Sequence, residues 1–486
     1  MSERHLAVIG AGPAGLAAAL AAAARGVRVT LIDSAPQAGG QFYRQPAQAL
    51  GARRPQALHH QWRTWERLRD GLAAQIAAGR IAHLTDHHVW YVERHVTATD
   101  SGSAHPEEHP APTAPTAPGF TVHALTGPEQ RAPAAVPADV VLLATGGYEK
   151  VLPFPGWTLP GVVTAGGAQA MLKGGLVLPG RTAVVAGTGP LLMPVAAGLA
   201  AAGAQVAALV DSADPKAFVR HTATLAAHPA KLAEGAQYAV TLLRHGVRTS
   251  VHHTVTQAHG TERLEAVTVA ALDSDGRVRP GTERRIACDT LAVGHGMLPH
   301  TDLAEALGCR TDAMKIAVDD EQRTSMPGVW AAGEATGIGG ATLALTEGRI
   351  AGLSIAASCH GTAPDAGSLT APAKARAALR SFFAAIDSVY VPPRHWSEQV
   401  TDDTVVCRCE EVRAGAIRAA VEELGAGDVR TVKLQTRAGM GWCQGRVCEP
   451  AVAKLAGCEL RPARRQFARP VPLGVLAEDT APEPTD

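Results

Sequence analysis

Four of the eight cysteines in this chain of 486 residues stand in two close pairs near the C-terminus. One residue separates Cys407 from Cys409, and four residues separate Cys443 from Cys448. Four cysteine thiolates are the ligands of a [2Fe–2S] cluster. Four cysteines also make a closed structural zinc site, although zinc ribbons more often place two residues inside each pair. The spacing therefore predicts a metal site of one of these two kinds.

The sequence around the second pair, GMGWCQGRVC at 439–448, is rich in glycine. Its backbone N–H groups could donate hydrogen bonds to cluster sulfur and so tune a redox potential. The segment 1–287 holds no cysteine, which argues against an enzyme that exchanges electrons through a dithiol pair in that part of the chain. The remaining thiols are expected to be buried, namely Cys288, Cys309, Cys359 and Cys458.

A nucleotide-binding pattern lies at the opposite end of the chain. Gly10, Gly12 and Gly15 form GxGxxG between an apolar run and an Ala/Leu-rich stretch, and Asp33 ends the next apolar run. The first glycine allows a tight turn, the second lets a pyrophosphate approach the backbone, and the third lets the helix pack closely on the sheet. The helix start attracts phosphate, and the acid accepts hydrogen bonds from a ribose. The predicted phosphate turn comprises Gly10, Gly12, Pro13, Ala14 and Gly15.

The pattern returns in the middle of the chain as TAVVAGTGPLL. Gly187 and Gly189 repeat the first two glycines, Leu192 stands where the third belongs, and Asp211 ends the following apolar run. Asp211 favours an unphosphorylated ribose, hence NAD over NADP. Three interpretations stay open for this second site, which are bound NAD, another bound adenine nucleotide, or a fold that has lost its ligand.

These residues need a strand, a tight turn, a helix and a second strand to hold them. The segments 5–35 and 182–213 both follow this order and end on similar letters, LIDSA and LVDSA. We interpret them as an internal repeat of one supersecondary unit. Abundant Ala and Gly, with only 4% aromatic residues, suit tightly packed βαβ layers. The predicted fold class is α/β, with two Rossmann-like dinucleotide-binding domains.

Charge and hydropathy exclude other classes. The formal net charge is zero and no basic stripe is present, which argues against a nucleic-acid binder. An apolar run begins within the first residues and leaves no room for a signal peptide. The uncharged stretch 191–210 has the length of a membrane span, but Pro194 and two glycines interrupt it, and a buried βαβ unit explains it better. We expect a cytoplasmic protein with no transmembrane segment.

Three further segments carry a resemblance to a known family. GGQ at 39–41, LLATGG at 142–147 and PGVWAAGEATG at 327–337 resemble the two-dinucleotide-binding-domain flavoproteins of the thioredoxin-reductase and disulfide-reductase type. The resemblance implies FAD in the first fold and places Glu334 near the ribityl–pyrophosphate, although that family usually has Asp there. The further FAD-binding residues implied are Gly40, Gln41, Arg44, Val89, Ala144, Thr145, Gly146, Gly333, Glu334, Ala341 and Thr342.

A second resemblance concerns the cysteines. CRCEEV and TRAGMGWCQGRVC resemble the bacterioferritin-associated-ferredoxin-like (BFD-like) [2Fe–2S] domain, a small helical domain. In particular, they resemble the form of this domain that is fused to the FAD subunits of multi-subunit amine and imino-acid dehydrogenases. This group includes the FAD subunits of hydrogen cyanide synthase and opine oxidase and the α subunit of D-hydroxyproline dehydrogenase. The resemblance implies a [2Fe–2S] cluster with the ligands Cys407, Cys409, Cys443 and Cys448.

The domain divisions follow from these motifs. The stretch 99–119 is interpreted as a flexible insertion in a surface hairpin, and the final LAEDTAPEPTD is expected to be disordered. The predicted divisions are a first part of the FAD-binding domain at 1–158, a second dinucleotide-binding-like domain at 159–290, a second part of the FAD-binding domain at 291–362, a linker and helix at 363–400, the BFD-like domain at 401–462 and a tail at 463–486.

Both cofactors together imply electron transfer, because a flavin accepts two electrons and a [2Fe–2S] centre passes one at a time. The resemblance implies an electron-transfer subunit of a heteromeric amino- or imino-acid dehydrogenase or oxidase, which takes electrons from a partner flavoprotein subunit. It also allows a small ferredoxin-like partner and FMN at a subunit interface. The alternatives are a stand-alone NAD(P)H-dependent reductase and a non-catalytic nucleotide-binding scaffold.

Overall fold

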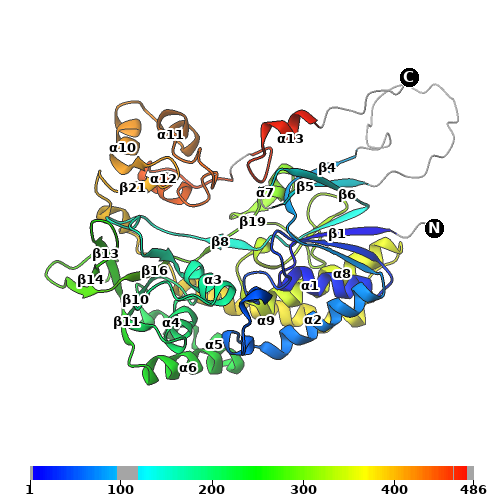
Figure 1. Cartoon of the computed structure of the whole chain (residues 1–486), viewed down its shortest axis with the longest axis horizontal. Helices are drawn as coiled ribbons and strands as arrows, with labels where there is room; N and C mark the ends of the chain where they lie inside the picture. The colour runs from blue at the N-terminus through cyan, green and yellow to red at the C-terminus, as the bar shows by residue number, and fades with distance from the viewer. Residues whose placement is uncertain (1–3, 96–118, 128, 463–464, 479–486) are drawn as a thin grey trace.

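The computed structural model describes residues 4–95, 119–127, 129–462 and 465–478 (Figure 1). The insertion predicted at 99–119 lies outside these residues except for Gly119, and so does the chain from 479 onward.

The first unit is built on a parallel sheet of order β20-β7-β1-β2-β3. Its strands are β1 (His5–Ile9), β2 (Arg28–Ile32), β3 (Ile81–Leu84), β7 (Val140–Leu143) and β20 (Val329–Ala331). Helices α1 (Pro13–Ala23) and α8 (Gly340–Cys359) lie side by side on one face (Figure 1). They pack at backbone distance, since a Cβ on Gly348 would lie 2.1 Å from the Ala14 carbonyl oxygen. Small residues are therefore required between the two helices.

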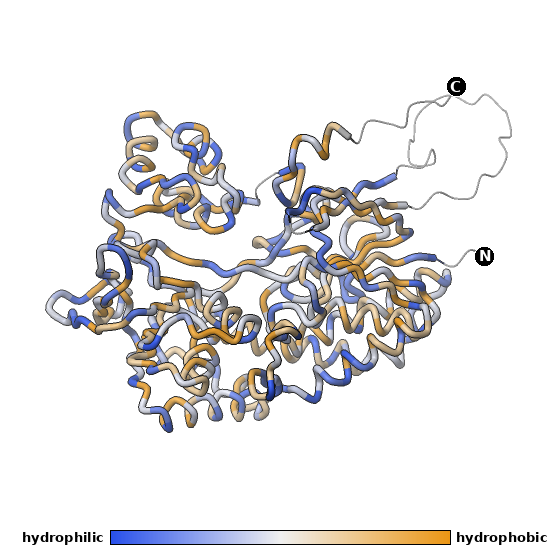
Figure 2. The backbone as a smooth tube through the Cα atoms, viewed as in Figure 1, coloured by the Kyte–Doolittle hydropathy of each residue, from blue (hydrophilic) through white to orange (hydrophobic). Residues whose placement is uncertain are grey.

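The other face of this sheet is covered by an antiparallel sheet, and α2 lies beside α1. The elements are β4 (His88–Arg94), β5 (Phe120–Thr126), β6 (Ala132–Ala138) and α2 (Trp62–Ala77). Leu6 and Val8 of β1 pack toward α1 and α8, whereas Ala7 and Ile9 pack toward β5 and β6. Burial on both faces explains the unbroken apolar run of this strand, and Figure 2 shows apolar residues gathered along these central strands and helices.

The second unit repeats this design with the strand order β12-β11-β10-β16-β9. The strands are β9 (Val162–Thr164), β10 (Thr182–Gly187), β11 (Gln205–Asp211), β12 (Arg248–Val251) and β16 (Thr290–Gly294). One face of this sheet is covered by the helices α3 (Ala165–Gly175), α4 (Leu192–Ala201) and α6 (Pro229–Arg244). The other face is covered by the antiparallel strands β13 (His253–His259), β14 (Ala266–Ala271) and β15 (Arg284–Ala287). The predicted internal repeat is confirmed, because β10, α4 and β11 occupy the places of β1, α1 and β2. This parallel sheet extends to residue 294, past the division predicted at 290.

Two antiparallel strands connect the units, β8 (Gly147–Glu149) and β17 (Met297–Pro299). Between β11 and α6 of the second unit lies the short helix α5 (Thr222–Ala226), and between β17 and β20 lie α7 (Asp302–Ala306), β18 (Thr311–Asp312) and β19 (Lys315–Ile316). The uncharged stretch 191–210 forms α4 and most of β11, and none of the helices in the described ranges is both long and apolar enough to cross a membrane.

A small helical domain follows α9 (Ala366–Val389) and has a core of its own (Figure 1). It consists of β21 (Val405–Cys407), β22 (Val412–Arg413), α10 (Ala414–Glu422), α11 (Val429–Thr436) and α12 (Glu449–Leu455).

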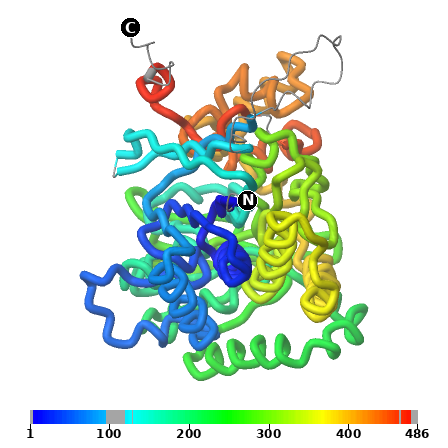
Figure 3. Tube along the Cα trace, turned by 90° about the vertical axis from the view of Figure 1, so that its right-hand side faces the viewer, coloured from blue at the N-terminus to red at the C-terminus, as the bar shows by residue number. Residues whose placement is uncertain are grey.

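Part of the predicted tail at 463–486 lies within the described residues. Residues 465–478 include α13 (Leu473–Glu478) and return to the first unit (Figure 3). There the Phe467 ring lies 5.0 Å from that of Trp90. Val475 joins the same apolar cluster as Trp90. The disorder expected for LAEDTAPEPTD does not include its first three residues, which end α13. Local composition does not reveal this packing, because the segment is buried on a distant unit.

Candidate functional site

The first glycine motif forms the turn between β1 and α1. Gly10 has φ +107°, and a Cβ there would lie 2.3 Å from the Ala144 carbonyl oxygen, so both conformation and space require glycine. Gly12 caps α1 without any side-chain hydrogen bond. A Cβ on Gly40 would lie 2.8 Å from the Gly12 Cα, which brings the GGQ loop against this turn. The turn therefore presents bare backbone at a helix start, the arrangement that accommodates a pyrophosphate.

Asp33 lies one residue beyond β2 and binds the glycine turn itself. Its Oδ2 accepts a hydrogen bond from the Ala11 N–H at 2.5 Å, and its Oδ1 accepts one from the Ala35 N–H at 2.7 Å. Burial raises the pKa of Asp33, although these hydrogen bonds oppose the shift. Val89 belongs to the same apolar cluster as Ile9 and Ile32, at the carboxyl ends of β1 and β2. The acid thus shapes the turn and keeps free lone pairs for a ribose hydroxyl.

Glu334 lies in the turn η5 (Gly333–Thr336), just before α8. Its Oε1 accepts a hydrogen bond from the Gly340 N–H at 2.8 Å, whereas its Oε2 is buried and accepts none from any described residue. Burial raises the pKa of this carboxyl. A buried acceptor without a partner is suited to a hydroxyl of a bound ligand. The Glu334 carboxylate therefore fits FAD in the first unit. The predicted Ala341 and Thr342 stand in the first turn of α8, beside this carboxylate.

Glu347 and Arg380 were not predicted from the sequence. Glu347, on α8, is only 1% exposed, and its Oε2 accepts hydrogen bonds from the Gly333 N–H at 3.1 Å and the Thr336 hydroxyl at 2.8 Å. Arg380 of α9 pairs with its Oε1 at 2.7 Å and donates to the Gly337 carbonyl oxygen at 2.9 Å. The pair fixes the loop that carries Glu334. No local pattern revealed it, because α9 was predicted only as a helix within a linker.

The other predicted flavin residues converge where the two units meet. Arg44 donates to the Gln41 Oε1 at 2.8 Å and lies against α3 of the second unit. Thr145 donates through its hydroxyl to the His300 carbonyl oxygen at 2.7 Å, and the His300 N–H donates to the Gly146 carbonyl oxygen at 3.0 Å. The strand end that carries the ATG sequence is thereby joined to the connection after β17.

The four paired cysteines lie together in the helical domain. The thiol of Cys407 lies close to that of Cys448, and the thiol of Cys409 lies close to that of Cys443. The Gly439 N–H donates to the Cys407 Sγ at 3.5 Å. The hydrogen bond from Cys448, with backbone N–H groups such as that of Gly439, lowers the pKa of Cys407 to about 5.

This pairing bears on which metal the site could hold. In the described part of the chain, no group of three or more His, Cys, Asp and Glu side chains is arranged to hold one ion. The thiols meet two by two instead, and this fits a centre of two irons that takes four cysteines. Cys407 and Cys448 are buried, whereas Cys409 is exposed. The other cysteines behave as predicted in part, since Cys288, Cys309 and Cys359 are buried while Cys458 is half-buried.

The second glycine motif differs from the first. The helix cap falls on Leu191 rather than Gly189, so α4 begins only at Leu192, which is buried in the core. Asp211 accepts a hydrogen bond from the Ala213 N–H at 3.0 Å, and burial raises its pKa to about 7. Burial, and then the charge of Asp211, raise the pKa of Tyr390 to about 12. The Tyr390 ring lies 5.8 Å from that of Phe218, in the segment that follows β11.

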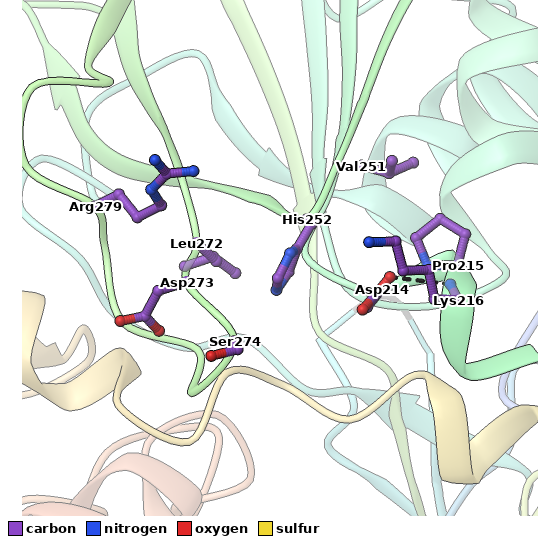
Figure 4. Close-up of a pocket in the computed structure, with 9 residues that line it drawn as sticks. All are labelled: Asp214, Pro215, Lys216, Val251, His252, Leu272, Asp273, Ser274 and Arg279. Carbon is purple, nitrogen blue, oxygen red and sulfur yellow. Dashed lines mark hydrogen bonds between the residues drawn. The ribbon is translucent and has the colours of Figure 1, made fainter.

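A cavity of about 630 Å³ opens beyond the carboxyl ends of β11 and β12 (Figure 4). His252 projects into it between Lys216 on one side and Arg279 on the other (Figure 4). Ligands of open α/β sheets bind at such carboxyl edges. The lining carries two cationic side chains, Lys216 and Arg279, and two acidic ones, Asp214 and Asp273. The lining residues are Asp214, Pro215, Lys216, Val251, His252, Leu272, Asp273, Ser274 and Arg279.

Comparison with known proteins defines the class. Residues 4–351 match the pyridine nucleotide-disulphide oxidoreductase family, and residues 405–456 match the BFD-like [2Fe-2S] binding domain. The chain therefore belongs to the pyridine nucleotide-disulphide oxidoreductase family and carries a BFD-like domain at its C-terminal end. The predicted fold class is confirmed, as are the predicted FAD and [2Fe–2S] cofactors, and the chain is a flavin-dependent oxidoreductase.

Particular relatives match almost the whole chain. Hydrogen cyanide synthase subunit HcnB of Pseudomonas aeruginosa is 33% identical over 91% of this chain and 90% of that protein. An opine oxidase subunit of Rhizobium meliloti is 35% identical over 92% of this chain and 91% of that protein. Both names describe subunits of larger enzymes. The crystal structure of L-proline dehydrogenase from P. horikoshii shares the fold, with a TM-score of 0.62 at 20% identity, over 97% of this chain and 79% of that one.

Proposed function

We propose that this chain is the electron-transfer subunit of a heteromeric amino- or imino-acid dehydrogenase or oxidase. The observation that carries the proposal is the joining of a flavin-binding unit and a [2Fe–2S] domain in one chain that matches HcnB and the opine oxidase subunit over nine-tenths of its length. When bound, FAD takes up an electron pair and a [2Fe–2S] cluster carries single electrons, so together they convert two-electron into one-electron transfer.

The residues of the chain would bind, orient and shield these groups. In the proposal, the Gly12 and Gly40 backbones admit the pyrophosphate, Asp33 receives the ribose, and the free oxygen of Glu334 receives a hydroxyl of the ribityl chain. The iron ligands are Cys407, Cys409, Cys443 and Cys448. The Gly439 N–H would donate to cluster sulfur, as it does to the Cys407 thiol.

The partner in this proposal is a catalytic FAD-dependent subunit that oxidises an amino or imino acid. A small ferredoxin-like subunit, and FMN at the interface between subunits, belong to the same proposal. The second unit would hold NAD or another adenine nucleotide, near Asp211 or in the cavity beside Lys216. We propose a cytoplasmic location.

The test compares reduction of the isolated chain with reduction of the complex. The chain is purified anaerobically with its FAD and iron, and absorption spectra are recorded after NADH is added. We expect no bleaching by NADH, and we expect reduction of both cofactors when a co-purified catalytic subunit is supplied with its amino or imino acid. Rapid bleaching of the isolated chain by NADH would instead establish a stand-alone reductase. A chain that stays oxidised under both conditions would be a scaffold.

A further inference from the structure

A buried carboxylate joins three distant parts of the chain. Asp302 is the first residue of α7, and its side chain is 8% exposed. Its neighbours Leu303 and Ala304 belong to the core of the first unit, so its position is fixed by packing. Its carboxylate pairs with His300 at 2.8 Å, with Arg446 at 2.8 Å and with Arg465 at 2.6 Å.

Two of these partners belong to the cluster side of the molecule. Arg446 stands between Cys443 and Cys448, in the loop that carries both, and it donates to Asp302 through Nε and Nη2. Arg465 lies in the segment that follows the helical domain and also pairs with Glu449, at 3.0 Å. Both guanidinium groups are largely buried, with exposed side-chain fractions of 16% and 13%.

The third partner leads to the flavin side. His300 contacts the Asp302 carboxylate through its ring, while its backbone exchanges hydrogen bonds with Thr145 and Gly146. These are the residues at the end of β7 that the sequence assigns to the flavin. The Asp302 carboxylate therefore connects the cysteine loop, through Arg446, to the predicted flavin loop, through His300.

A buried carboxylate is stable only while its charged partners stay in contact with it. Removing one member leaves the other charges buried and unpaired, so the arrangement tolerates few alternatives. Burial alone would raise the pKa of Asp302, but the hydrogen bond and charge of His300 and the charges of Arg446 and Arg465 hold it below its usual range. The carboxylate is therefore ionised at neutral pH, as this arrangement requires.

Other contacts join the helical domain to the second unit, whose core contains Trp157. The Trp157 Nε1–H donates to the Val405 carbonyl oxygen at 2.6 Å, the Arg408 guanidinium lies over the Trp157 ring, and Val447 packs on the apolar cluster around Trp157. None of these contacts includes Asp302, so we expect a variant at this position to fold.

We propose that Asp302 is a positioning residue that docks the cysteine loop 443–448 on the flavin-binding unit and so sets the approach between the cluster and the flavin. The consequence for electron transfer rests on the proposed function, whereas the docking itself does not. The carboxylate takes no part in the chemistry, and it acts through Arg446, Arg465 and His300.

The test uses the full-length protein carrying FAD and iron, with the variant Asp302→Asn. The control is Asp320→Asn, in which the same change removes the carboxylate that pairs with Arg376 but is 98% exposed. Hydrogen–deuterium exchange of 439–448 and 465–471 reports docking. Flash photoreduction of the bound flavin, followed at the cluster absorbance, reports transfer within the chain and needs no partner protein.

In Asp302→Asn we expect exchange in both segments to rise by about tenfold or more, since a local contact is lost while the fold persists. We expect cluster reduction to slow by about tenfold at unchanged flavin content and flavin reduction rate, because small misplacements of reacting groups cost large factors. The control should match wild type. Wild-type exchange in the iron-loaded variant would overturn the docking role, and raised exchange with wild-type cluster reduction would overturn its effect on the approach to the flavin.

Arg465→Gln, which lies outside the cysteine loop, provides the second variant, and it should show the same pattern with smaller changes. Loss of iron in both variants, with the FAD-binding unit still folded, would also overturn the proposal, because the contacts would then serve to build the cluster site itself. None of these outcomes depends on the identity of the catalytic partner, so they are distinct from a failure of the proposed function.

Discussion

Replacing Arg380 with methionine should loosen the loop that carries Glu334. The change keeps most of the aliphatic stem and removes the guanidinium that pairs with the Glu347 carboxylate at 2.7 and 3.0 Å. Glu347 is 1% exposed, so its charge would remain buried with only the Gly333 N–H and the Thr336 hydroxyl to stabilise it. Breaking a buried pair by removing one partner costs about 3–5 kcal/mol. Because Arg380 is itself 31% exposed, we expect the lower end, about 3 kcal/mol.

The assay is urea unfolding of the FAD-loaded protein, followed by flavin fluorescence and by circular dichroism. Arg380→Met should lower the unfolding midpoint and release FAD more readily, since Gly333 and Thr336 flank Glu334. Adding Glu347→Gln removes the unpaired charge and should recover part of the loss. Lys374→Met changes an exposed cation on the same helix and should stay within about 0.5 kcal/mol of wild type. A single variant as stable as wild type, or a double variant no better than the single, would refute the reasoning.

Further predictions concern the two nucleotide folds and the interface with the helical domain. The folded-state pKa of Asp211, about 7, exceeds its ordinary value of 3.8. The contribution of Asp211 to the free energy of unfolding is therefore greatest below pH about 4 and is lost as the pH rises through 7. Asp211→Asn should therefore be more stable than wild type at pH 8, by up to about 4 kcal/mol in thermal unfolding, and should lose this advantage near pH 4. Gly15→Val should abolish FAD binding after gel filtration, because a Cβ there would lie 1.8 Å from the Gly10 carbonyl oxygen, whereas Gly235→Ala, in open space, should retain FAD. Trp157→Phe removes a 2.6 Å hydrogen bond to the helical domain and should destabilise this contact by about 1 kcal/mol, seen as faster hydrogen exchange in 405–413 at unchanged flavin content; equal exchange would contradict it.

The motifs that were predicted share one property, which is that their residues lie close together in sequence. Gly10, Gly12 and Gly15 act within one turn, and the repeat at 182–213 follows the same local order. The cysteine pairs are separated by 33 residues, yet their types and spacing alone indicate a metal. Helical and strand periodicity, turn chemistry and ligand type are all properties of short segments, so a single sequence expresses them.

Contacts between distant segments were not predicted. Asp302 and Arg446 are 144 positions apart, and Glu347 and Arg380 lie on different helices. Nothing in the letters around Tyr390 indicates that its ring lies 5.8 Å from that of Phe218. Charge pairs between distant segments depend on how whole units pack. The sequence around a charged residue is the same whether the residue stays exposed or pairs with an opposite charge in the folded protein.

The sequence by itself determined two dinucleotide folds and four thiols of the kind that hold a metal centre, because glycine turns and cysteine spacing are properties of the order of residues along the chain. Only the tertiary structure decided how these parts face each other. The connecting strands, the return of residues 465–478 and the carboxylate of Asp302 set that arrangement. The physical reason is that a buried charge takes its stability from partners brought by other domains, and their distance and direction exist only after the domains have packed.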